Sequence, residues 1–297
     1  MSGAWQQQRE RGSLGALRFM TWLARSLGYR SASLLLAPIC LYFLAFAPRA
    51  RAASRQFLGR VQGRPASLGE VYRHFHAFAG TLLDRIEVLR GRGGDFEVHV
   101  HGGEALNAAL APRRGCLLLG SHLGSFEVLR VLGEARSGLA VNLVMHEGNA
   151  PHASRWARAL APELAARIIA PGTPGTLLRV RECLERGEPV AMLGDRVLGG
   201  ERTVTCDFLG AAARFPSGPL LTAAMLGVPV VTFFCLRRGP RSYDVRFELL
   251  AERIEPDRAG REQAVARSAC AFAERLEAHA RAAPDNWFNF YDYWDAR

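Results

Sequence analysis

The chain has 297 residues, of which 49% are hydrophobic and 22% charged, and this composition excludes a disordered, collagen-like or low-complexity protein. Its formal net charge is +10, and all 38 basic residues are arginine. The absence of lysine excludes Schiff-base chemistry, a lysine-anchored pyridoxal cofactor and the Walker-type phosphate loop. The arginine excess suits an anionic membrane surface, an acidic protein partner or nucleic acid, and charge alone does not choose among them.

The amino terminus predicts two helices, the second of them associated with a membrane. Apolar residues recur at helical spacing over 14–27, which is typical of an amphipathic helix. Residues 31–48 carry no charge and are flanked by Arg30 and Arg49. This length is borderline for a span, since roughly 20 residues cross a bilayer. A buried core helix is the alternative, and a cleaved signal peptide does not fit, because arginines follow the apolar run. With arginine on both sides, neither a crossing nor a shallow insertion is favoured.

Helices alternate with strands from residue 67 onward. Ser67 and Glu70 form an S-x-x-E capping box before a helix that reaches Leu89. Strands are predicted at 96–100, 116–119, 139–145, 190–193, 228–236 and 243–250, and helices at 104–110, 125–136, 174–186, 218–226 and 261–282. Most of these strands are continuously apolar, so we predict an α/β fold with a mostly parallel central sheet flanked by helices. We expect a membrane-associated segment over residues 1–60 and one catalytic domain over 61–297.

The cysteines and most histidines predict structural positions. The six cysteines never stand at C-x-x-C spacing and mostly have apolar neighbours, which predicts reduced core residues and a reducing compartment. They are Cys40, Cys116, Cys183, Cys206, Cys235 and Cys270. His74 and His76 point to different faces of a predicted helix, while His99 and His101 share a strand face without a third ligand nearby. We therefore predict no metal site.

The window from Gly120 to Glu127 is the most informative for chemistry. His122 follows a buried strand, at the edge of the sheet where ligand sites of α/β proteins collect. Glu127, on the first turn of the next helix, can reach the ring and fix its tautomer, which would make His122 a general base. The backbone amides of Gly124 and Ser125 are candidates for stabilising an oxyanion. The alternatives are a glutamate that serves the helix dipole and a histidine that is merely packed.

Several ordered blocks carry a resemblance to a known family. They are the H-x4-E of His122 and Glu127, then VNLVMHEGNAP, PVAMLGDR and DFLGAAARFPSGPLLTAAMLGVPVV. Over about residues 95–250 the chain resembles the bacterial lipid A biosynthesis (lauroyl/myristoyl) acyltransferases of the lysophospholipid acyltransferase superfamily. The aromatic tail, residues 287–294, is similar to the variant of this family found in aryl-polyene pigment clusters. We expect that tail to dock against the domain rather than enter the lipid interface.

The resemblance implies that His122 is the base and Glu127 its partner. It implies that a second group lines the acceptor or donor cleft: Asp195, Arg196, Arg214 and Gly218. The two arginines suit phosphate or carboxylate groups, and the glycine suits a close backbone approach. Surface ion pairing and ordinary helix entry explain the same residues equally well. Asn149, which follows a predicted strand, is a further candidate for substrate contact.

The resemblance implies a membrane-associated O-acyltransferase. An acyl group would move from an acyl carrier protein or coenzyme A thioester to a hydroxyl of a lipid or glycolipid, with no cofactor besides the donor. The window lacks the G-x-S-x-G of serine hydrolases, so direct transfer fits better than a covalent enzyme intermediate. The expected partners are acyl carrier protein and membrane lipid, without nucleic acid. The expected location is the bacterial inner membrane, with the catalytic domain facing the cytoplasm. An acyl thioesterase and a basic, membrane-tethered binding protein are the alternatives.

Overall fold

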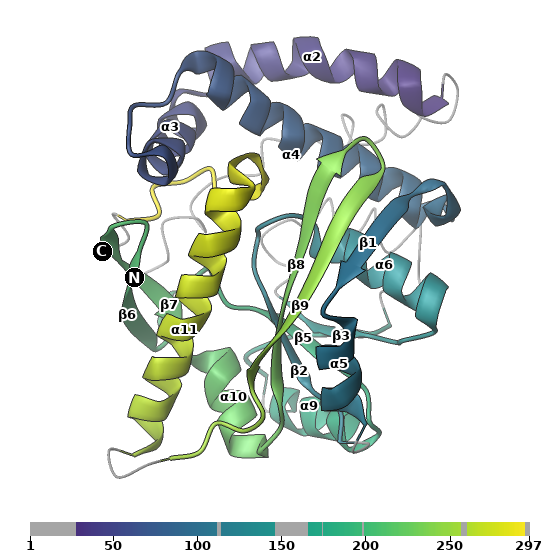
Figure 1. Cartoon of the computed structure of the whole chain (residues 1–297), viewed down its shortest axis with the longest axis vertical. Helices are drawn as coiled ribbons and strands as arrows, with labels where there is room; N and C mark the ends of the chain where they lie inside the picture. The colour runs from purple at the N-terminus through teal and green to yellow at the C-terminus, as the bar shows by residue number, and fades with distance from the viewer. Residues whose placement is uncertain are drawn as a thin grey trace.

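The computed structural model describes residues 28–111, 114–145, 166–173, 175–197, 199–256 and 260–294, and the helix predicted at 14–27 lies outside them. Three helices precede the sheet: α2 (Gly28–Phe46), α3 (Pro48–Gln62) and α4 (Leu68–Leu89). α2 lies across one end of the molecule alongside α4, and the sheet lies on the other side of α4 (Figure 1). By length and composition, α2 is able to cross a membrane.

A seven-stranded sheet with the order β1-β9-β8-β2-β5-β3-β4 forms the centre of the molecule. Its strands are β1 (Glu97–His101), β2 (Leu117–Gly120), β3 (Asn142–Val144), β4 (Ile168–Ile169), β5 (Val190–Leu193), β8 (Val230–Gly239) and β9 (Ser242–Ala251). Every neighbouring pair is parallel except the β8–β9 hairpin. The prediction of a mostly parallel α/β sheet is therefore confirmed.

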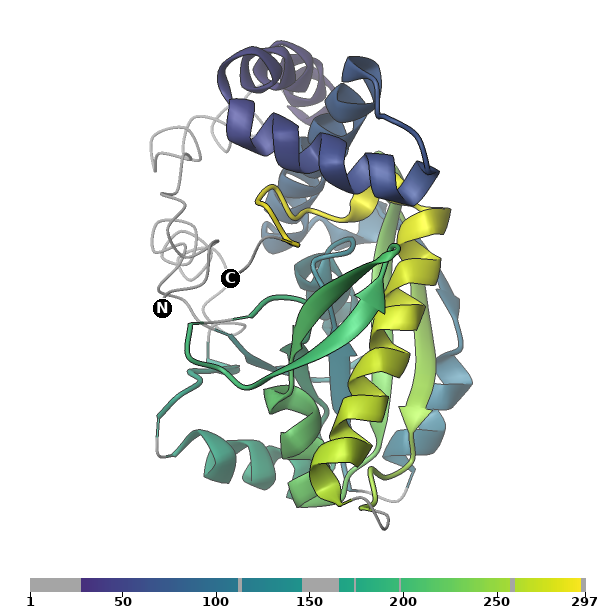
Figure 2. The ribbon, with the colours of Figure 1, turned by 90° about the vertical axis from the view of Figure 1, so that its left-hand side faces the viewer.

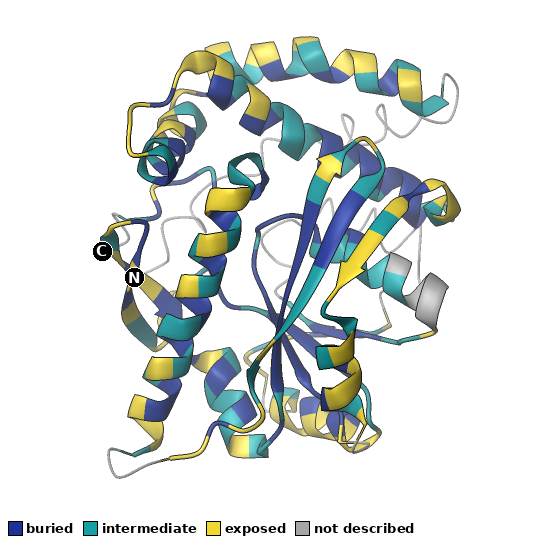
Figure 3. Ribbon diagram, viewed as in Figure 1, coloured by how far each residue is buried: buried dark blue, intermediate teal, exposed yellow. Residues whose placement is uncertain are grey.

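Helices cover this sheet because its central strands are apolar on both faces. They are α5 (Gly103–Leu110), α6 (Phe126–Ser137), α9 (Thr176–Glu185), α10 (Gly218–Leu226) and α11 (Arg261–Ala282). All four residues of β2 are buried, and the central strands are dark blue in Figure 3. The predicted capping box is present at the start of α4, where Ser67 and the Glu70 side chain each accept a hydrogen bond from the other's backbone N–H.

Two antiparallel strands that the sequence did not predict form a separate hairpin, β6 (Thr203–Phe208) and β7 (Ala211–Pro216). Leu209 and Gly210 both have positive φ, as a tight two-residue turn between strands requires. The hairpin lies beside α11 in Figure 2. Phe208 and Phe215 are fully buried there, in ring contact with Trp287 or Tyr293 of the carboxyl-terminal segment. The hairpin therefore holds that segment against the domain.

The prediction that all six cysteines are reduced is wrong for one pair. A disulfide joins Cys206 of β6 to Cys270 of α11, with their Cα atoms 5.2 Å apart. The pairing depends on the packing of β6 against α11, which brings together residues 64 positions apart in the sequence. The remaining cysteines are free and buried, as predicted: Cys40, Cys116, Cys183 and Cys235.

His74 of α4 is fully buried and held in its neutral form. Its Nε2 lies 2.9 Å from the carbonyl oxygen of Trp287, which only accepts, so Nε2 carries the proton. The unprotonated Nδ1 then accepts from the Ser54 hydroxyl at 2.8 Å. Burial lowers the pKa of His74 to about 4, even though the hydrogen bond to Trp287 acts in the opposite direction.

This histidine makes the stability of the fold depend on pH. Because its folded pKa is depressed, the unfolded chain binds a proton first as the pH falls below the ordinary histidine value. We expect the free energy of unfolding to fall by about 3 kcal/mol between pH 6.5 and 4 through His74 alone. Urea unfolding of the detergent-solubilised protein at each pH measures this loss.

The matched variants for that measurement are His74→Gln and His99→Gln. His99, whose side chain is 55% exposed on β1, serves as the control for loss of a histidine from the surface. His74→Gln removes the titrating group and should flatten the curve, although the variant starts from a lower stability. An undiminished slope in His74→Gln would contradict the assignment.

Candidate active site

Two neighbouring strands deliver His122 and Asp195 to the same edge of the sheet. β2 and β5 run parallel, with Gly120 opposite Leu193. His122 stands two residues beyond Gly120, and Asp195 stands two residues beyond Leu193, so the register places them opposite each other. The N–H of Gly194 donates to the carbonyl of Gly120 at 2.9 Å and continues the pairing past the strand ends. Carboxyl ends of parallel strands are where α/β proteins bind ligands.

His122 and Asp195 form a directed hydrogen-bonded pair. Nδ1 of His122 lies 2.8 Å from Oδ1 of Asp195, and the backbone N–H of His122 donates to Oδ2 at 3.0 Å. An ionised carboxylate only accepts, so Nδ1 carries the proton and Nε2 keeps its lone pair. The side chain of Asp195 is fully buried, whereas that of His122 is 23% exposed. The ring is therefore fixed in orientation and still reachable from outside.

The charges around this pair favour a carboxylate beside a neutral imidazole. Burial acts to raise the pKa of Asp195, but His122 and Arg196 outweigh it and lower this pKa to about 2. Burial also lowers the pKa of His122, with Arg196 adding to the effect and Asp195 opposing it. At neutral pH the imidazole is uncharged, and Nε2 is able to take up a proton. This is the electrostatic arrangement of a general base.

The carboxyl-terminal segment supplies the remaining hydrogen bonds to Asp195. Trp287 Nε1 donates to Oδ2 at 3.1 Å, and Asn289 Nδ2 donates to the same oxygen at 3.2 Å. Arg196 is held by this segment as well, through Asn289 Oδ1 at 2.6 Å and the Phe288 carbonyl at 2.9 Å. Trp287 is fully buried. The prediction that the aromatic tail docks against the domain is confirmed.

Trp287 and Asn289 were not predicted as site residues. The signal that pointed to them is the N-W-F-N-F pattern of residues 286–290, in which one asparagine precedes the aromatic run and Asn289 stands inside it. A buried asparagine needs hydrogen-bond partners, so an asparagine within an aromatic run indicates that its side-chain amide binds a buried polar group elsewhere in the protein. The sequence does not reveal that the acceptor is Asp195, about ninety residues away.

The structure corrects the expected oxyanion site at Gly124 and Ser125. The N–H of Gly124 donates to the carbonyl of Asn286 at 2.8 Å, and the N–H of Ser125 donates to the carbonyl of Cys235 at 2.9 Å. Gly124 has φ +81°, and a Cβ atom there would lie 1.8 Å from the Cys235 oxygen. Both amides are thus occupied by backbone partners. Gly124 serves the close approach of the loop to β8, not a ligand.

The structure also gives the orienting role to a different carboxylate from the one predicted. Glu127, on the first turn of α6, forms an ion pair with Arg85 of α4. The hydrogen bond on Nδ1 of His122 belongs instead to Asp195. Sequence proximity favoured Glu127, whereas adjacency of β2 and β5 in the sheet favours Asp195. Arg85 and Glu127 are mostly buried, so their pair joins α6 to α4 beside the site.

Three further residues were predicted to contact substrate: Asn149, Arg214 and Gly218. Asn149 lies outside the described residues. Arg214 is exposed on β7, opposite Thr205 of β6. Gly218 is exposed at the start of α10, with nothing within 4 Å of a Cβ atom placed there. The described geometry therefore brings Asp195 and Arg196 to His122 and leaves Arg214 and Gly218 on the hairpin and helix that follow.

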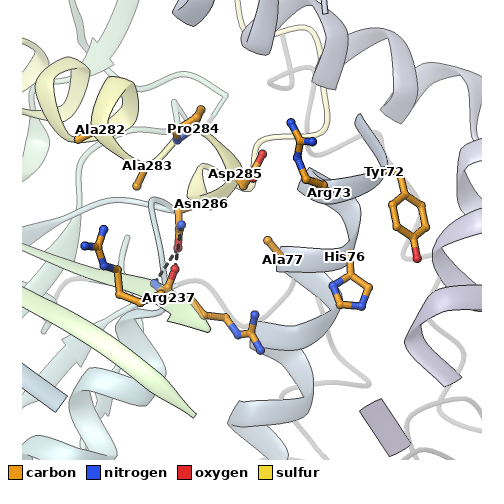
Figure 4. Close-up of a pocket in the computed structure, with 11 residues that line it drawn as sticks. Tyr72, Arg73, His76, Ala77, Arg237, Ala282, Ala283, Pro284, Asp285 and Asn286 are labelled. Atoms are coloured by element: carbon orange, nitrogen blue, oxygen red, sulfur yellow. Dashed lines mark hydrogen bonds between the residues drawn. The ribbon is translucent and has the colours of Figure 1, made fainter. Parts of the chain in front are cut away.

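A cavity of about 510 Å³ lies between α4, the end of β8 and η2 (Pro284–Asn286) (Figure 4). Asn286, which lines this cavity, joins η2 to the end of β8. Its side-chain oxygen accepts from the Arg237 N–H at 2.8 Å, and its amide nitrogen donates to the Arg237 carbonyl at 3.2 Å. The Arg237 guanidinium is paired with the buried Asp84. Arg238 is paired with Asp244. These arginine charges are already neutralised by structural partners.

Comparison with known families finds one match over nearly the whole chain. The model of the family described as bacterial lipid A biosynthesis acyltransferase matches residues 16–295. This range includes His122, Asp195 and the carboxyl-terminal segment that holds them. A search of curated proteins finds no match.

The titration of His122 distinguishes Asp195 from Glu127 as the carboxylate that orients its ring. Asp195 raises the His122 pKa, because a nearby carboxylate favours the charged imidazolium. Asp195→Asn removes that charge, so His122 should titrate at a lower pH than in the wild type. Nuclear magnetic resonance of the protein with isotope-labelled histidine measures this shift, with the His122 signals assigned from His122→Ala.

Glu127→Gln is the matched control, since Glu127 pairs with Arg85. We expect the His122 titration to be unchanged in this variant. If Glu127→Gln moved the titration and Asp195→Asn did not, the glutamate would be the orienting group after all. Thermal unfolding of both variants verifies that each remains folded.

Proposed function

Because the chain belongs to the family of bacterial lipid A biosynthesis acyltransferases, we propose that it transfers an acyl group from a thioester donor to a hydroxyl of a lipid or glycolipid. The observation that carries the proposal is the His122–Asp195 pair, with Nε2 left unprotonated at the edge of the sheet. A hydroxyl nucleophile needs a base, and a thioester brings its own activation. His122 supplies the base, and the donor supplies the activated carbonyl group.

The proposed reaction proceeds by direct transfer. Nε2 of His122 removes the proton of the acceptor hydroxyl while its oxygen attacks the thioester carbonyl carbon. Asp195 stabilises the imidazolium that forms and keeps the ring in the correct tautomer. The carbon–sulfur bond then breaks, and the imidazolium returns its proton to the departing thiolate. The products are an ester and a free thiol, and His122 is again neutral.

Ser121, beside the base, is unsuited to a covalent intermediate. Its side chain is buried, and its Oγ accepts the backbone N–H of Leu123 at 3.2 Å. The hydroxyl therefore supports the loop that carries His122. Among the described residues beside the base, this favours attack by the acceptor itself over attack by a serine of the enzyme.

We propose acyl carrier protein or coenzyme A as donor and the cytoplasmic face of the bacterial inner membrane as location. Both donors are acidic and water-soluble, and the chain has a net charge of +10. The apolar α2 provides contact with the membrane that holds the acceptor. Disulfides are rare in a reducing cytoplasm, so the Cys206–Cys270 bond opposes the cytoplasmic part of this proposal.

His122→Ala should abolish transfer while leaving the protein folded and bound to membranes. Removal of the general base and its orienting bond is expected to lower the rate by about 10³-fold or more. Mass spectrometry of lipid extracts from cells lacking the gene, complemented with the wild type or with His122→Ala, measures the change. The acylated lipid should return only with the wild type.

The destination of the acyl group separates the proposal from its nearest alternative. With labelled acyl thioester, an acyltransferase places the label in an extractable lipid, whereas a thioesterase releases free fatty acid. Full activity of His122→Ala would refute the assignment of the base. Release of fatty acid alone, with no lipid product, would replace transfer by hydrolysis.

Trp287→Phe should lower kcat by about tenfold, since a hydrogen bond to a buried charged group is worth about 1.5–3 kcal/mol and part of this is lost at the transition state. The matched control is Trp294→Phe. Trp294 belongs to the same segment, but its Nε1 donates to the carbonyl of Phe208, not to Asp195. Steady-state kinetics with labelled donor measures kcat and KM for each.

Both replacements remove an indole from the same aromatic cluster, so thermal unfolding controls for lost packing. We expect only Trp287→Phe to lower kcat, with KM little changed, because Trp287 acts through Asp195 and does not touch substrate. Equal losses of kcat in the two variants would mean that Trp287 has only a packing role.

A further inference from the structure

The face of α2 that points away from α4 is apolar and exposed. Its large side chains are exposed by 77% at Leu34, 55% at Leu41, 59% at Tyr42 and 67% at Phe46. Figure 3 shows this exposed face along the outer edge of the molecule. A helix at a protein–water surface normally places polar side chains there. An apolar helix face of this length marks a contact with another apolar phase.

The opposite face of α2 packs against α4 and the core of the domain. In the first turn, the Tyr29 hydroxyl donates to Asp84 of α4 at 2.6 Å. Leu36, in the middle, packs in one cluster with Leu83. Cys40, further along, joins the main core of the domain. The buried positions therefore form a continuous stripe, and α2 has no part that extends away from the body.

This packing is incompatible with α2 crossing a bilayer. At 1.5 Å per residue, its 19 residues measure about 28 Å, close to the roughly 30 Å of a hydrocarbon core. A bilayer that enclosed α2 from end to end would also enclose the α4 segment beside it. That segment carries Arg73, Asp84 and Arg85, and Asp84 is bonded to Arg237 of the sheet. Charged groups at the centre of a bilayer are costly.

We propose that α2 lies in the plane of the membrane, with its exposed face in one leaflet and both of its ends at the same surface. The surface is that of an anionic phospholipid bilayer, because Arg30 and Arg49 are exposed at the two ends of the apolar run. Arginines on both sides of a spanning helix would conflict in orientation, whereas at one surface both meet lipid phosphates. The proposal rests on the packing of α2 and not on the proposed acyl transfer.

Labelling of introduced cysteines tests the orientation. Arg30→Cys and Arg49→Cys place one thiol at each end of α2, and a membrane-impermeant maleimide is applied to right-side-out and to inverted membrane vesicles. Both positions should react from the same side. The wild type provides the background, since its free cysteines in the described part of the chain are buried. Reaction from opposite sides would show that α2 spans the membrane and would overturn the proposal.

Vesicle flotation tests the apolar face itself. Leu34→Gln combined with Leu41→Gln should reduce partition onto phosphatidylethanolamine–phosphatidylglycerol vesicles at least tenfold. The matched control combines Leu177→Gln with Leu178→Gln on α9, at the opposite end of the molecule in Figure 1. These leucines are 43% and 58% exposed, so the control removes similar exposed apolar surface. Its partition should equal that of the wild type.

Equal partition of the α2 double variant and the wild type would overturn the proposal, as would an equal loss in the α9 control. All four substituted leucines are exposed, so the variants should unfold at the wild-type temperature. His122 plays no part in either measurement. A failure here would leave the proposed transfer reaction untouched, and a failure of the reaction would leave the membrane orientation untouched.

Discussion

The buried carboxylate of Asp195 is the group on which the site depends. It is completely enclosed, and a charge in that position is tolerated only where hydrogen bonds replace the lost water. Four donors do so: the backbone N–H and Nδ1 of His122, Nε1 of Trp287 and Nδ2 of Asn289. Removing one of them leaves the others to satisfy a charge that remains buried. The carboxylate thus requires the strand ends and the carboxyl-terminal segment to be in place together.

The same requirement links the site to the helices at the end of the molecule. The Trp287 indole donates to Asp195, and the Trp287 carbonyl accepts from Nε2 of His74 on α4. His74 accepts in turn from Ser54 of α3. A continuous set of hydrogen bonds therefore runs from α3 and α4 through Trp287 and Asp195 to His122. Ser54, His74, Trp287 and Asp195 are buried, and the hydrogen bonds fix the tautomers of the two histidines, so each position constrains the next.

The sequence predicted the elements well and the pairings between them poorly. Apolar runs such as 190–193 and the capping box at Ser67 are local signals, and both elements lie where they were predicted. The β6–β7 hairpin was missed because its half-buried strands mix polar and apolar residues, whereas most of the predicted strands are continuously apolar. Contacts that depend on sheet order cannot be derived from local patterns. The pairing of His122 with Asp195 in place of Glu127 is one such contact, and the Cys206–Cys270 bond is another.

The proposed position of α2, together with the hydrogen bonds that link α4 to His122, sets the distance between the membrane surface and His122. If α2 lies in the membrane plane, α4 lies directly beneath it, at the depth of the lipid head groups. His74 belongs to α4, so the hydrogen bonds through Trp287 hold His122 at a fixed height below that surface. In the proposed reaction, a hydroxyl in a head group would then meet His122 while its acyl chains remain in the bilayer. The proposed water-soluble thioester donor would approach from the aqueous side, so that the lipid stays in the bilayer and the donor stays in water.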